Sequence, residues 1–479
     1  MSININRIRL FSLKHYRLQM GALMFASDLT AFGLVWAGLR LAGAFLPSIF
    51  PDFGSEEFLV VSLLSMLLIF YSRLYPGSGI NPADEIRMVV ERTSIGVTIG
   101  LFILLVLHLQ GSLDFRPYLL VWAAIPAAVL SVRWTVRIQA GRLGFWGEPV
   151  ALIGKRERIS YLLGYFQQRR RLGFIPALAV VPDDEAGSFD VGIPVLPLSC
   201  LLAKGARLAY HESIQSALVD IENAPEIIRM DTQKVFSDLF HRVILFVDVD
   251  WLEGASLRVQ DYEGLLGVEA RKNELSAASQ ILKRGMDLVI ALLMGLGSLP
   301  ITLAAALAIR LDGPGSIFYL HERVGRNGER ISIYKFRTML PNAEALLQDY
   351  LRANPAAREE WRQTQKLKDD PRITRPGRWL RKWSIDELPQ LLNVLKGEMS
   401  LVGPRPMLAD QVCLYTGIDS YYGVRPGLTG LWQVSGRNHT TFEERSRYDV
   451  YYVRNWSVWL DIYILLRTVW VVLSRDGAY

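Results

Sequence analysis

The sequence predicts a membrane protein of three parts: a helical bundle, an α/β domain, and a C-terminal domain held by a re-entrant membrane helix. Three observations indicate this fold class. Four apolar runs lie near the N-terminus, short apolar strands alternate with a helix in the middle, and basic residues flank a fifth apolar run. The expected boundaries are 1–148 for the four-helix transmembrane region, 149–275 for the α/β domain and 276–479 for the C-terminal domain.

Composition limits the class of protein. The chain has 479 residues, which is too long for one ordinary domain. A hydrophobic share of 51% against 21% charged residues excludes a disordered chain. Two cysteines exclude a disulfide scaffold and a cysteine cluster for zinc or iron–sulfur. The net charge of +6 fits anionic lipid, nucleic acid or a phosphorylated substrate.

The N-terminal third predicts four membrane spans. A spanning helix needs about 20 apolar residues. The four apolar runs are Met20–Leu46, Phe58–Tyr71, Thr93–Leu109 and Tyr118–Val132. The first run is long enough by itself, and the other three reach that length with their flanks.

Loop charges predict that both ends of this bundle face the cytoplasm. The N-terminal tail holds four basic residues and no acid: Arg7, Arg9, Lys14 and Arg17. The loop at 47–57 contains three acids and no Lys or Arg, whereas arginines follow the second and fourth runs. Since positive charge is retained on the cytoplasmic side, the C-terminal remainder of the chain is expected in the cytoplasm.

Asp28 lies inside the first apolar run. An ionisable residue within a span indicates a functional site by default. A hydrogen bond between two helices explains the same residue equally well. The sequence leaves both interpretations open.

The middle of the chain predicts an α/β domain. Val150–Ile153, Ala177–Val181 and Val243–Val249 are expected strands, and Arg156–Phe166 is an expected helix, as in βαβ units. The first strand ends at Gly154, where a dinucleotide-binding fold continues as G-x-G-x-x-G. Only the first glycine is present. We therefore predict a degenerate Rossmann-like domain that serves as a scaffold or a regulatory domain without a cofactor.

A fifth apolar run, Leu288–Ile309, is the longest uncharged stretch. An ordinary fifth transmembrane helix is one interpretation. However, both flanks are basic, so both prefer the cytoplasmic side. The run is also interrupted by Gly295, Gly297, Ser298 and Pro300. Because proline removes a backbone N–H and clashes with the preceding turn, we predict a helix–break–helix hairpin near 284–310 that re-enters the same face.

Adjacent acids in the C-terminal domain are candidate catalytic residues. Asp386 and Glu387 precede leucines spaced along one helix face: Leu388, Leu391, Leu392 and Leu395. In a structural interpretation, Ser384 and Glu387 form a capping box at the start of this helix. In a functional one, a helix N-terminus attracts phosphate, one carboxylate holds Mg²⁺, and the other attacks or activates a phosphoryl group.

Cations are dense around this acid pair. They are Lys335, Arg337, Arg378, Arg381, Lys382, Arg405, Arg425 and Arg437. Arginine forks match phosphate geometry, so this density favours a phosphorylated substrate. In Arg375–Trp383, cations alternate with tryptophans, as in segments at a membrane interface. Beside a membrane segment, this pattern favours lipid over nucleic acid.

Several segments resemble the bacterial monotopic phosphoglycosyl transferases of the bacterial sugar transferase family. They are Tyr334–Met339, Asp370–Thr374, Ser384–Gln390, Asn393–Pro406, Arg425–Asn438 and Ser474–Tyr479. The similarity covers about Lys283–Tyr479. The four N-terminal runs and the α/β domain are similar in architecture to the large subgroup of that family.

The resemblance implies a mainly α-helical, monotopic catalytic domain on the cytoplasmic face of the bacterial inner membrane. The implied reaction transfers hexose-1-phosphate from a UDP-hexose, with galactose or glucose, to undecaprenyl phosphate. UMP and undecaprenyl-diphosphate-hexose would form, starting O-antigen, capsule or exopolysaccharide synthesis. The expected partners are UDP-hexose, undecaprenyl phosphate, the lipid bilayer and a second copy of the chain in a homodimer; nucleic acid is not expected.

The resemblance also assigns roles to single residues. Asp386 is the expected nucleophile, forming a covalent phosphosugar intermediate with ping-pong kinetics. Glu387 is the expected ligand of the cofactor Mg²⁺. Substrate-binding residues are expected at Lys335, Arg337, Arg381, Arg405, Gln433 and Arg437.

Two other functions compete with this interpretation. A membrane nucleotide-sugar dehydratase or epimerase would need a complete dinucleotide fingerprint and a Tyr-x-x-x-Lys pair. A non-enzymatic regulator of polysaccharide assembly would use the acid pair only as a helix cap.

Overall fold

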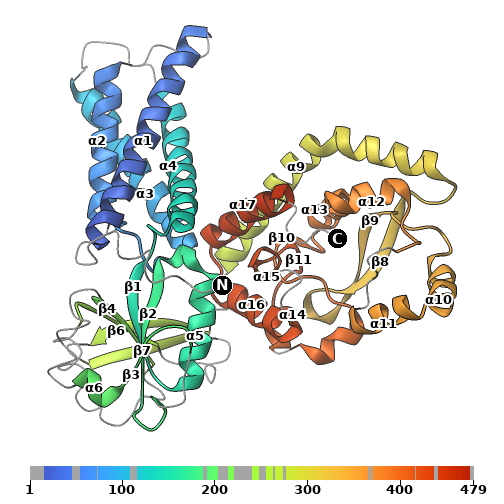
Figure 1. Ribbon diagram of the computed structural model, residues 1–479. Coiled ribbons are helices and arrows are strands. Elements are labelled where there is room, and N and C mark those ends of the chain that lie inside the picture. Colours follow the sequence, from blue (N-terminus) through green and yellow to red (C-terminus); the bar gives the residue numbers. More distant parts are fainter. Residues whose placement is uncertain are drawn as a thin grey trace. The chain divides into compact units, whose positions relative to one another are not determined.

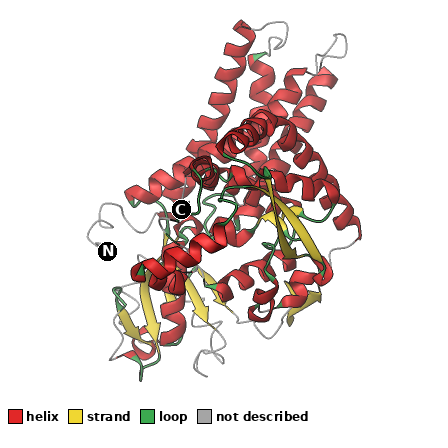
Figure 2. Cartoon of the chain, turned by 90° about the vertical axis from the view of Figure 1, so that its right-hand side faces the viewer, coloured by secondary structure: helices red, strands yellow, loops and turns green. Residues whose placement is uncertain are grey.

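The computed structural model describes residues 16–45, 54–72, 74–107, 116–186, 191–202, 214–220, 240–246, 255–262, 265–272, 277–364, 367, 370–415, 417–435 and 441–474. The chain forms two compact units, Met1–Val249 and Asp250–Tyr479. Helices make up most of the described residues (Figure 2).

The first unit begins with four helices that run side by side (Figure 1). They are α1 (Tyr16–Phe45), α2 (Ser55–Tyr71), α3 (Pro82–Leu107) and α4 (Arg116–Leu143). Each predicted apolar run falls largely within one of these helices. By length and composition α1, α3 and α4 can cross a membrane, whereas α2 has only 17 residues. Large apolar side chains on their outer faces are exposed, as contact with lipid requires.

Asp28 joins two of these helices. Its carboxylate accepts two hydrogen bonds of 2.6 Å from the Arg133 guanidinium on α4, and the Tyr75 hydroxyl donates a third. Arg133 also lies 3.3 Å from Glu85, which pairs with Arg137. Asp28 and Arg133 are fully buried. Of the two interpretations of Asp28, the structure shows the bond between helices.

The α/β domain contains a five-stranded parallel sheet in the order β3-β2-β1-β4-β5. Its elements are β1 (Glu148–Ile153), α5 (Arg156–Gln168), β2 (Phe174–Val181), β3 (Val195–Pro197), α6 (Leu198–Leu202), β4 (Ser216–Asp220) and β5 (Arg242–Phe246). The predicted strands and helix are therefore confirmed, apart from residues 247–249, which lie outside the described residues. Apolar side chains cover both sheet faces, as parallel sheets require.

The start of α5 explains why this sheet lacks the glycine fingerprint. The amide of Arg156 donates a 2.8 Å hydrogen bond to the Glu185 carboxylate. In a dinucleotide-binding fold the phosphates occupy this helix N-terminus. In this domain the Glu185 side chain occupies the N-terminus of α5 in place of a phosphate.

The second unit combines two hairpins with many short helices. Its strands are β6 (Ala255–Tyr262), β7 (Leu265–Lys272), β8 (Phe318–Val324), β9 (Arg330–Phe336), β10 (Ser400–Val402) and β11 (Gly427–Thr429). Its α-helices are α9 (Ala277–Asp312), α10 (Ala343–Ala353), α11 (Pro355–Thr364), α12 (Arg375–Lys382), α13 (Leu391–Lys396), α14 (Ile418–Tyr422), α15 (Leu431–Ser435), α16 (Phe442–Arg454) and α17 (Val458–Ser474). Pairs β6–β7 and β8–β9 are antiparallel, whereas β10–β11 is parallel.

Helix α9 contains the fifth apolar run and continues for 36 residues with Pro300 inside. The predicted break in the middle of this run is therefore wrong. A proline removes only one backbone donor, and the flanking turns keep their own hydrogen bonds. Figure 1 shows the helix bending along its length. By length and composition α9 can also cross a membrane.

The first turns of α9 are bonded to the rest of the second unit. The Lys283 ammonium lies 2.7 Å from the Asp461 carboxylate of α17. One turn later, Asp287 accepts a 2.8 Å hydrogen bond from the Ser400 hydroxyl. Asp287 and Asp461 are buried.

The last turns of α9 are bonded to the same unit. The Arg337 guanidinium at the end of β9 donates hydrogen bonds to the carbonyls of Ile309 and Gly313, at 3.3 and 3.0 Å. Ile309 packs against Phe336 and Leu380. Both ends of α9 are therefore held by one globular unit.

Candidate active site

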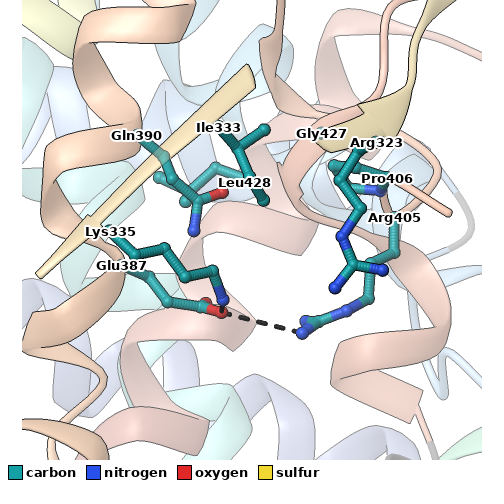
Figure 3. Close-up of a pocket in the computed structure, with 9 residues that line it drawn as sticks. All are labelled: Arg323, Ile333, Lys335, Glu387, Gln390, Arg405, Pro406, Gly427 and Leu428. Atoms are coloured by element: carbon teal, nitrogen blue, oxygen red, sulfur yellow. Dashed lines mark hydrogen bonds and ion pairs between the residues drawn. The ribbon is translucent and has the colours of Figure 1, made fainter. Parts of the chain in front are cut away.

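A pocket in the second unit collects side chains from three segments (Figure 3). Hairpin β8–β9 forms one wall, the 3-10 helix Ile385–Gln390 forms the second, and the loop after β10 together with β11 forms the third. The lining residues are Arg323, Ile333, Lys335, Glu387, Gln390, Arg405, Pro406, Gly427 and Leu428.

A turn at Ser384 presents the acid pair. Ser384 has φ of +54°, in the left-handed region, directly after α12. A non-glycine residue costs about 1–3 kcal/mol in such a conformation. Its side chain makes no cap hydrogen bond, so the predicted capping box with Glu387 is wrong. After this turn Glu387 lines the pocket, whereas Asp386 is mostly buried beside it and is not among the lining residues.

The predicted apolar helix face is also wrong. Leu391 is buried, whereas Leu392 and Leu395 are 46% and 37% exposed. The segment starts as a 3-10 helix with Pro389 and becomes α-helical only at Leu391. A 3-10 helix has three residues per turn, so the expected spacing of 3.6 does not apply across it.

Glu387 faces two cations across the pocket (Figure 3). Its Oε1 lies 2.7 Å from the Lys335 ammonium and 3.7 Å from a guanidinium nitrogen of Arg405. Lys335 comes from β9 and Arg405 from the loop after β10. The structure therefore brings together three of the residues predicted from sequence.

The pKa of Asp386, next to Glu387, is raised above the ordinary value of an aspartate. Burial, and after it the neighbouring Glu387 carboxylate, raise the pKa of Asp386 to about 6, while Lys335 and Arg381 oppose the rise. At neutral pH the group is mostly ionised but poorly solvated. A carboxylate in this state, next to cations, suits attack on an electrophilic phosphorus.

Backbone contacts hold the loop that carries Arg405. The Gly403 amide donates to the Thr429 carbonyl at 2.9 Å, and the Gly427 amide donates to the Pro404 carbonyl at 2.7 Å. A Cβ at Gly427 would lie 2.1 Å from the Gly403 nitrogen, so only glycine allows this approach.

The other predicted substrate residues have separate locations. Arg381 donates a 2.9 Å hydrogen bond to the Thr338 hydroxyl and acts electrostatically on Asp386. Arg337 binds the carbonyls at the end of α9 and is not among the pocket residues. Gln433 lies on α15, partly buried, and does not line the described pocket. Arg437 lies outside the described residues.

Sequence reasoning missed Arg323 and Gln390 as pocket residues. Arg323 lies in the basic flank that follows the fifth apolar run, and the sequence indicates only a role in topology for that flank. The alternation of side chains along a strand could have identified Arg323. Every second residue of a strand and its cross-strand partners lie on the same face of a hairpin. The pairs Arg323–Ile331, His321–Ile333 and Tyr319–Lys335 put Arg323 and Lys335 on one face of the hairpin.

The site suits a magnesium ion that is completed by substrate. Within the described ranges, no group of three or more His, Cys, Asp or Glu could hold a metal. Mg²⁺ in phosphoryl-transfer sites usually takes one or two carboxylates plus substrate phosphates and water. Asp386 and Glu387 supply two adjacent carboxylates, and the cations around them would bind the same phosphates.

The fold and the site define a membrane-associated protein whose C-terminal unit surrounds a carboxylate pair with cations. Residues 278–475 match the family described as bacterial sugar transferase. Exopolysaccharide production protein ExoY of Sinorhizobium fredii is 48% identical over 200 residues, covering 42% of this chain and 88% of that protein. The chain therefore belongs to the bacterial sugar transferase family.

Two other relatives extend the comparison. Undecaprenyl-phosphate galactose phosphotransferase of Salmonella typhimurium is 47% identical over 210 residues, or 44% of each chain. UDP-glucose:undecaprenyl-phosphate glucose-1-phosphate transferase of Escherichia coli is 29% identical over 426 residues, or 84% of each chain. The chain spans about half the length of several curated relatives that it matches. The matched part covers 56% of a sugar transferase of Haemophilus influenzae and 42% of a UDP-galactose-lipid carrier transferase of Erwinia amylovora.

Proposed function

We propose that the protein transfers hexose-1-phosphate from a UDP-hexose to undecaprenyl phosphate, forming undecaprenyl-diphosphate-hexose and UMP. The observation that carries this proposal is that Glu387 faces Lys335 and Arg405 in one pocket, while the adjacent Asp386 is buried next to it and interacts electrostatically with Lys335 and Arg381. Family membership supports the same reaction. One relative is named as a galactose phosphotransferase and another as a glucose-1-phosphate transferase, and both names give undecaprenyl phosphate as a substrate. The donor is accordingly proposed as UDP-galactose or UDP-glucose.

Asp386 is the proposed nucleophile. One of its carboxylate oxygens attacks the β-phosphorus of UDP-hexose and forms a new P–O bond. The bond from that phosphorus to the oxygen of UMP breaks, and UMP leaves with the electron pair. An oxygen of undecaprenyl phosphate then attacks the same phosphorus and releases the Asp386 carboxylate. The two displacements predict ping-pong kinetics.

Neighbouring residues prepare the carboxylate and bind the phosphates. Lys335 and Arg381 favour the ionised form of Asp386, as their opposing effect on its pKa indicates. Arg405 reaches the pocket from a loop whose backbone is already fixed. Such preorganised cations stabilise charge that develops on the phosphoryl oxygens. When bound, Mg²⁺ would neutralise diphosphate charge, with Glu387 as the proposed ligand.

We also propose that α9 enters and leaves the membrane by the cytoplasmic face. A helix of 36 residues is about 54 Å long, more than the roughly 30 Å hydrocarbon core. Yet Lys283 near its start and Ile309 near its end are both bonded to the same globular unit. These contacts support the re-entrant anchor, and the bend of α9 along its length supplies the change of direction (Figure 1).

Cysteine accessibility tests this topology. Cys200 and Cys413 are exposed, so both are first replaced by serine. Single cysteines are then placed at Ala278, in the first turn of α9, and at Glu322, on the strand that follows α9. Membrane-impermeant maleimide should label both positions in inverted inner-membrane vesicles and neither in spheroplasts. Labelling of Glu322→Cys in spheroplasts would overturn the topology.

The proposed setting is the bacterial inner membrane at the start of O-antigen, capsule or exopolysaccharide synthesis. The relative from S. fredii is named for exopolysaccharide production. We propose a homodimer, which light scattering of the purified protein–detergent complex would check against its mass.

The central experiment supplies purified full-length protein with undecaprenyl phosphate, Mg²⁺ and either UDP-galactose or UDP-glucose. UMP release should require the wild-type protein and be lost in Asp386→Asn. Mass spectrometry should find hexose phosphate on the peptide containing Asp386 when the lipid acceptor is withheld. No UMP with any UDP-hexose, or full activity in Asp386→Asn, would contradict the proposal.

A further inference from the structure

Arg323 and Arg405 lie on the same side of the pocket, opposite Lys335 and Glu387 (Figure 3). We propose that these two guanidinium groups form a clamp that binds one phosphate group of a substrate, with Arg323 as a binding residue. This inference rests on the proposed function and deepens it. The phosphate belongs either to the UDP-hexose or to the undecaprenyl phosphate.

None of the described acids forms an ion pair with Arg323, and Asp410 acts on it only electrostatically. Its Nε is buried and has no hydrogen-bond partner in the described part of the chain. Its Nη2 contacts only a ring nitrogen of His321, at 3.3 Å, and none of the described carboxylates lies within 4 Å of it. Burial and the neighbouring Arg405 lower the pKa of the Arg323 guanidinium. A dianionic phosphate would relieve this repulsion and use the free donor.

His321 supports the orientation of Arg323. Both residues belong to β8 and point to the face that carries Ile333 and Lys335. Burial, together with Arg323 and Lys335, lowers the pKa of His321 to about 4. The ring is therefore neutral at pH 7, and its Nδ1 can accept a hydrogen bond from the guanidinium.

The fold forces the two arginines together without a ligand. The Val324 amide, next to Arg323, donates a 2.9 Å hydrogen bond to the carbonyl of Met407, two residues after Arg405. The buried Tyr421 hydroxyl donates to the Val324 carbonyl at 2.5 Å and accepts from the Met407 amide at 3.3 Å. Two like charges are thus held side by side by backbone contacts, which is the arrangement that a preformed anion site needs.

The test compares Arg323→Met, Arg323→Lys and a control, Arg330→Met, in the full-length protein. Arg330 lies on the same hairpin with its side chain 80% exposed, so its loss changes net charge equally without touching the pocket. One arm measures KM for UDP-hexose from the UMP burst without acceptor. The other measures KM for undecaprenyl phosphate by chasing the isolated covalent intermediate.

Arg323→Met should raise one of these two KM values by about 10- to 100-fold, since a hydrogen bond to a charged group contributes about 1.5–3 kcal/mol. The affected arm identifies the source of the phosphate. Arg323→Lys should recover part of the loss, and Arg330→Met should change neither value. Unchanged KM values in both arms for Arg323→Met would overturn the clamp.

Thermal unfolding separates binding from a structural role and from the proposed reaction. Inorganic pyrophosphate and UMP should raise the unfolding midpoint of the wild type but not that of Arg323→Met. Without these probes, Arg323→Met should unfold at the same or a higher temperature, because it removes repulsion. Protection of an inactive wild type would reject the proposed reaction but support the clamp. Equal protection of both proteins would exclude a clamp on the UDP-hexose phosphates; together with an unchanged KM for undecaprenyl phosphate, it would reject the clamp altogether.

Discussion

The Lys335 ammonium lies 2.7 Å from Oε1 of Glu387, which joins residues 52 positions apart in the sequence. Both side chains are largely shielded, at 18% and 23% exposure. An ion pair in this partly dry pocket is stronger than the same pair on the surface. It holds Glu387 beside Asp386 in the orientation that the pocket needs.

We predict that Lys335 and Glu387 act as a unit. Lys335→Met and Glu387→Gln should each lower kcat/KM for UMP release by about 10²- to 10³-fold, as loss of a preorganised electrostatic group does. The double variant should lose less than the product of the two effects, because each single change already breaks the pair.

The matched control is the Arg330–Glu322 pair on the neighbouring hairpin. These side chains are 80% and 75% exposed at 3.9 Å. Their substitution should leave kcat/KM unchanged. Strictly multiplicative losses at Lys335 and Glu387 would show that the two residues act independently.

The pH dependence of the first half-reaction should report Asp386. Attack requires the ionised carboxylate, and its pKa is about 6. The rate should therefore rise with pH through about 6 and level off above 7, falling tenfold per pH unit well below 6. Arg381→Met removes a cation that lowers this pKa, so its acid limb should move to higher pH. Rapid-quench measurements of the UMP burst give the profile.

Arg337→Met is the control for this shift. It removes the same charge as Arg381→Met, but the guanidinium of Arg337 binds carbonyls at the end of α9. Its acid limb should coincide with that of the wild type. An equal displacement in both variants would assign the effect to net charge.

The raised pKa of Asp386 also predicts a stability effect. A carboxyl whose pKa is higher in the folded state binds more protons there than in the unfolded state between pH 4 and 6. Folding stability should therefore fall as pH rises through this window. Asp386→Asn should unfold at a higher midpoint than the wild type at pH 7.5, and the two should converge near pH 4. A lower midpoint for Asp386→Asn at pH 7.5 would contradict this.

The Lys283–Asp461 contact should stabilise the base of α9. Asp461 is fully buried and also accepts hydrogen bonds from Tyr452 and Trp456. Lys283→Met leaves this charge without its cation, which costs about 3–5 kcal/mol for a buried pair. Chemical unfolding in detergent measures the loss. Arg447→Met, which breaks an exposed pair with Glu443 on α16, should cost under about 0.5 kcal/mol.

The Asp28–Arg133 pair should stabilise the helical bundle in the same way. Arg133→Met should lower the unfolding midpoint strongly, because it leaves Asp28 buried and charged. The double variant Asp28→Asn/Arg133→Met should recover much of the loss. Arg87→Met, in an exposed pair with Glu91 on α3, serves as control. An additive double variant would show that the pair is not coupled.

The sequence by itself determined where the apolar helices and short strands lie, and it determined the chemical character of the candidate site. Lengths and positions of apolar runs decided where membrane helices lie, since spanning a bilayer depends on local composition. Short apolar strands around one helix decided the parallel sheet. The adjacent acids at 386–387 and the surrounding cations pointed to phosphate chemistry, because charge and residue type are local properties.

Only the tertiary structure decided which side chains meet. It separates Arg381, beside Asp386, from Arg337, at the end of α9. It adds Arg323 to the pocket through strand register and gives Asp28 its partner on another helix. The left-handed turn at Ser384 replaced the expected cap. These outcomes depend on contacts between residues far apart in the chain, whose geometry is set by packing and not by local spacing.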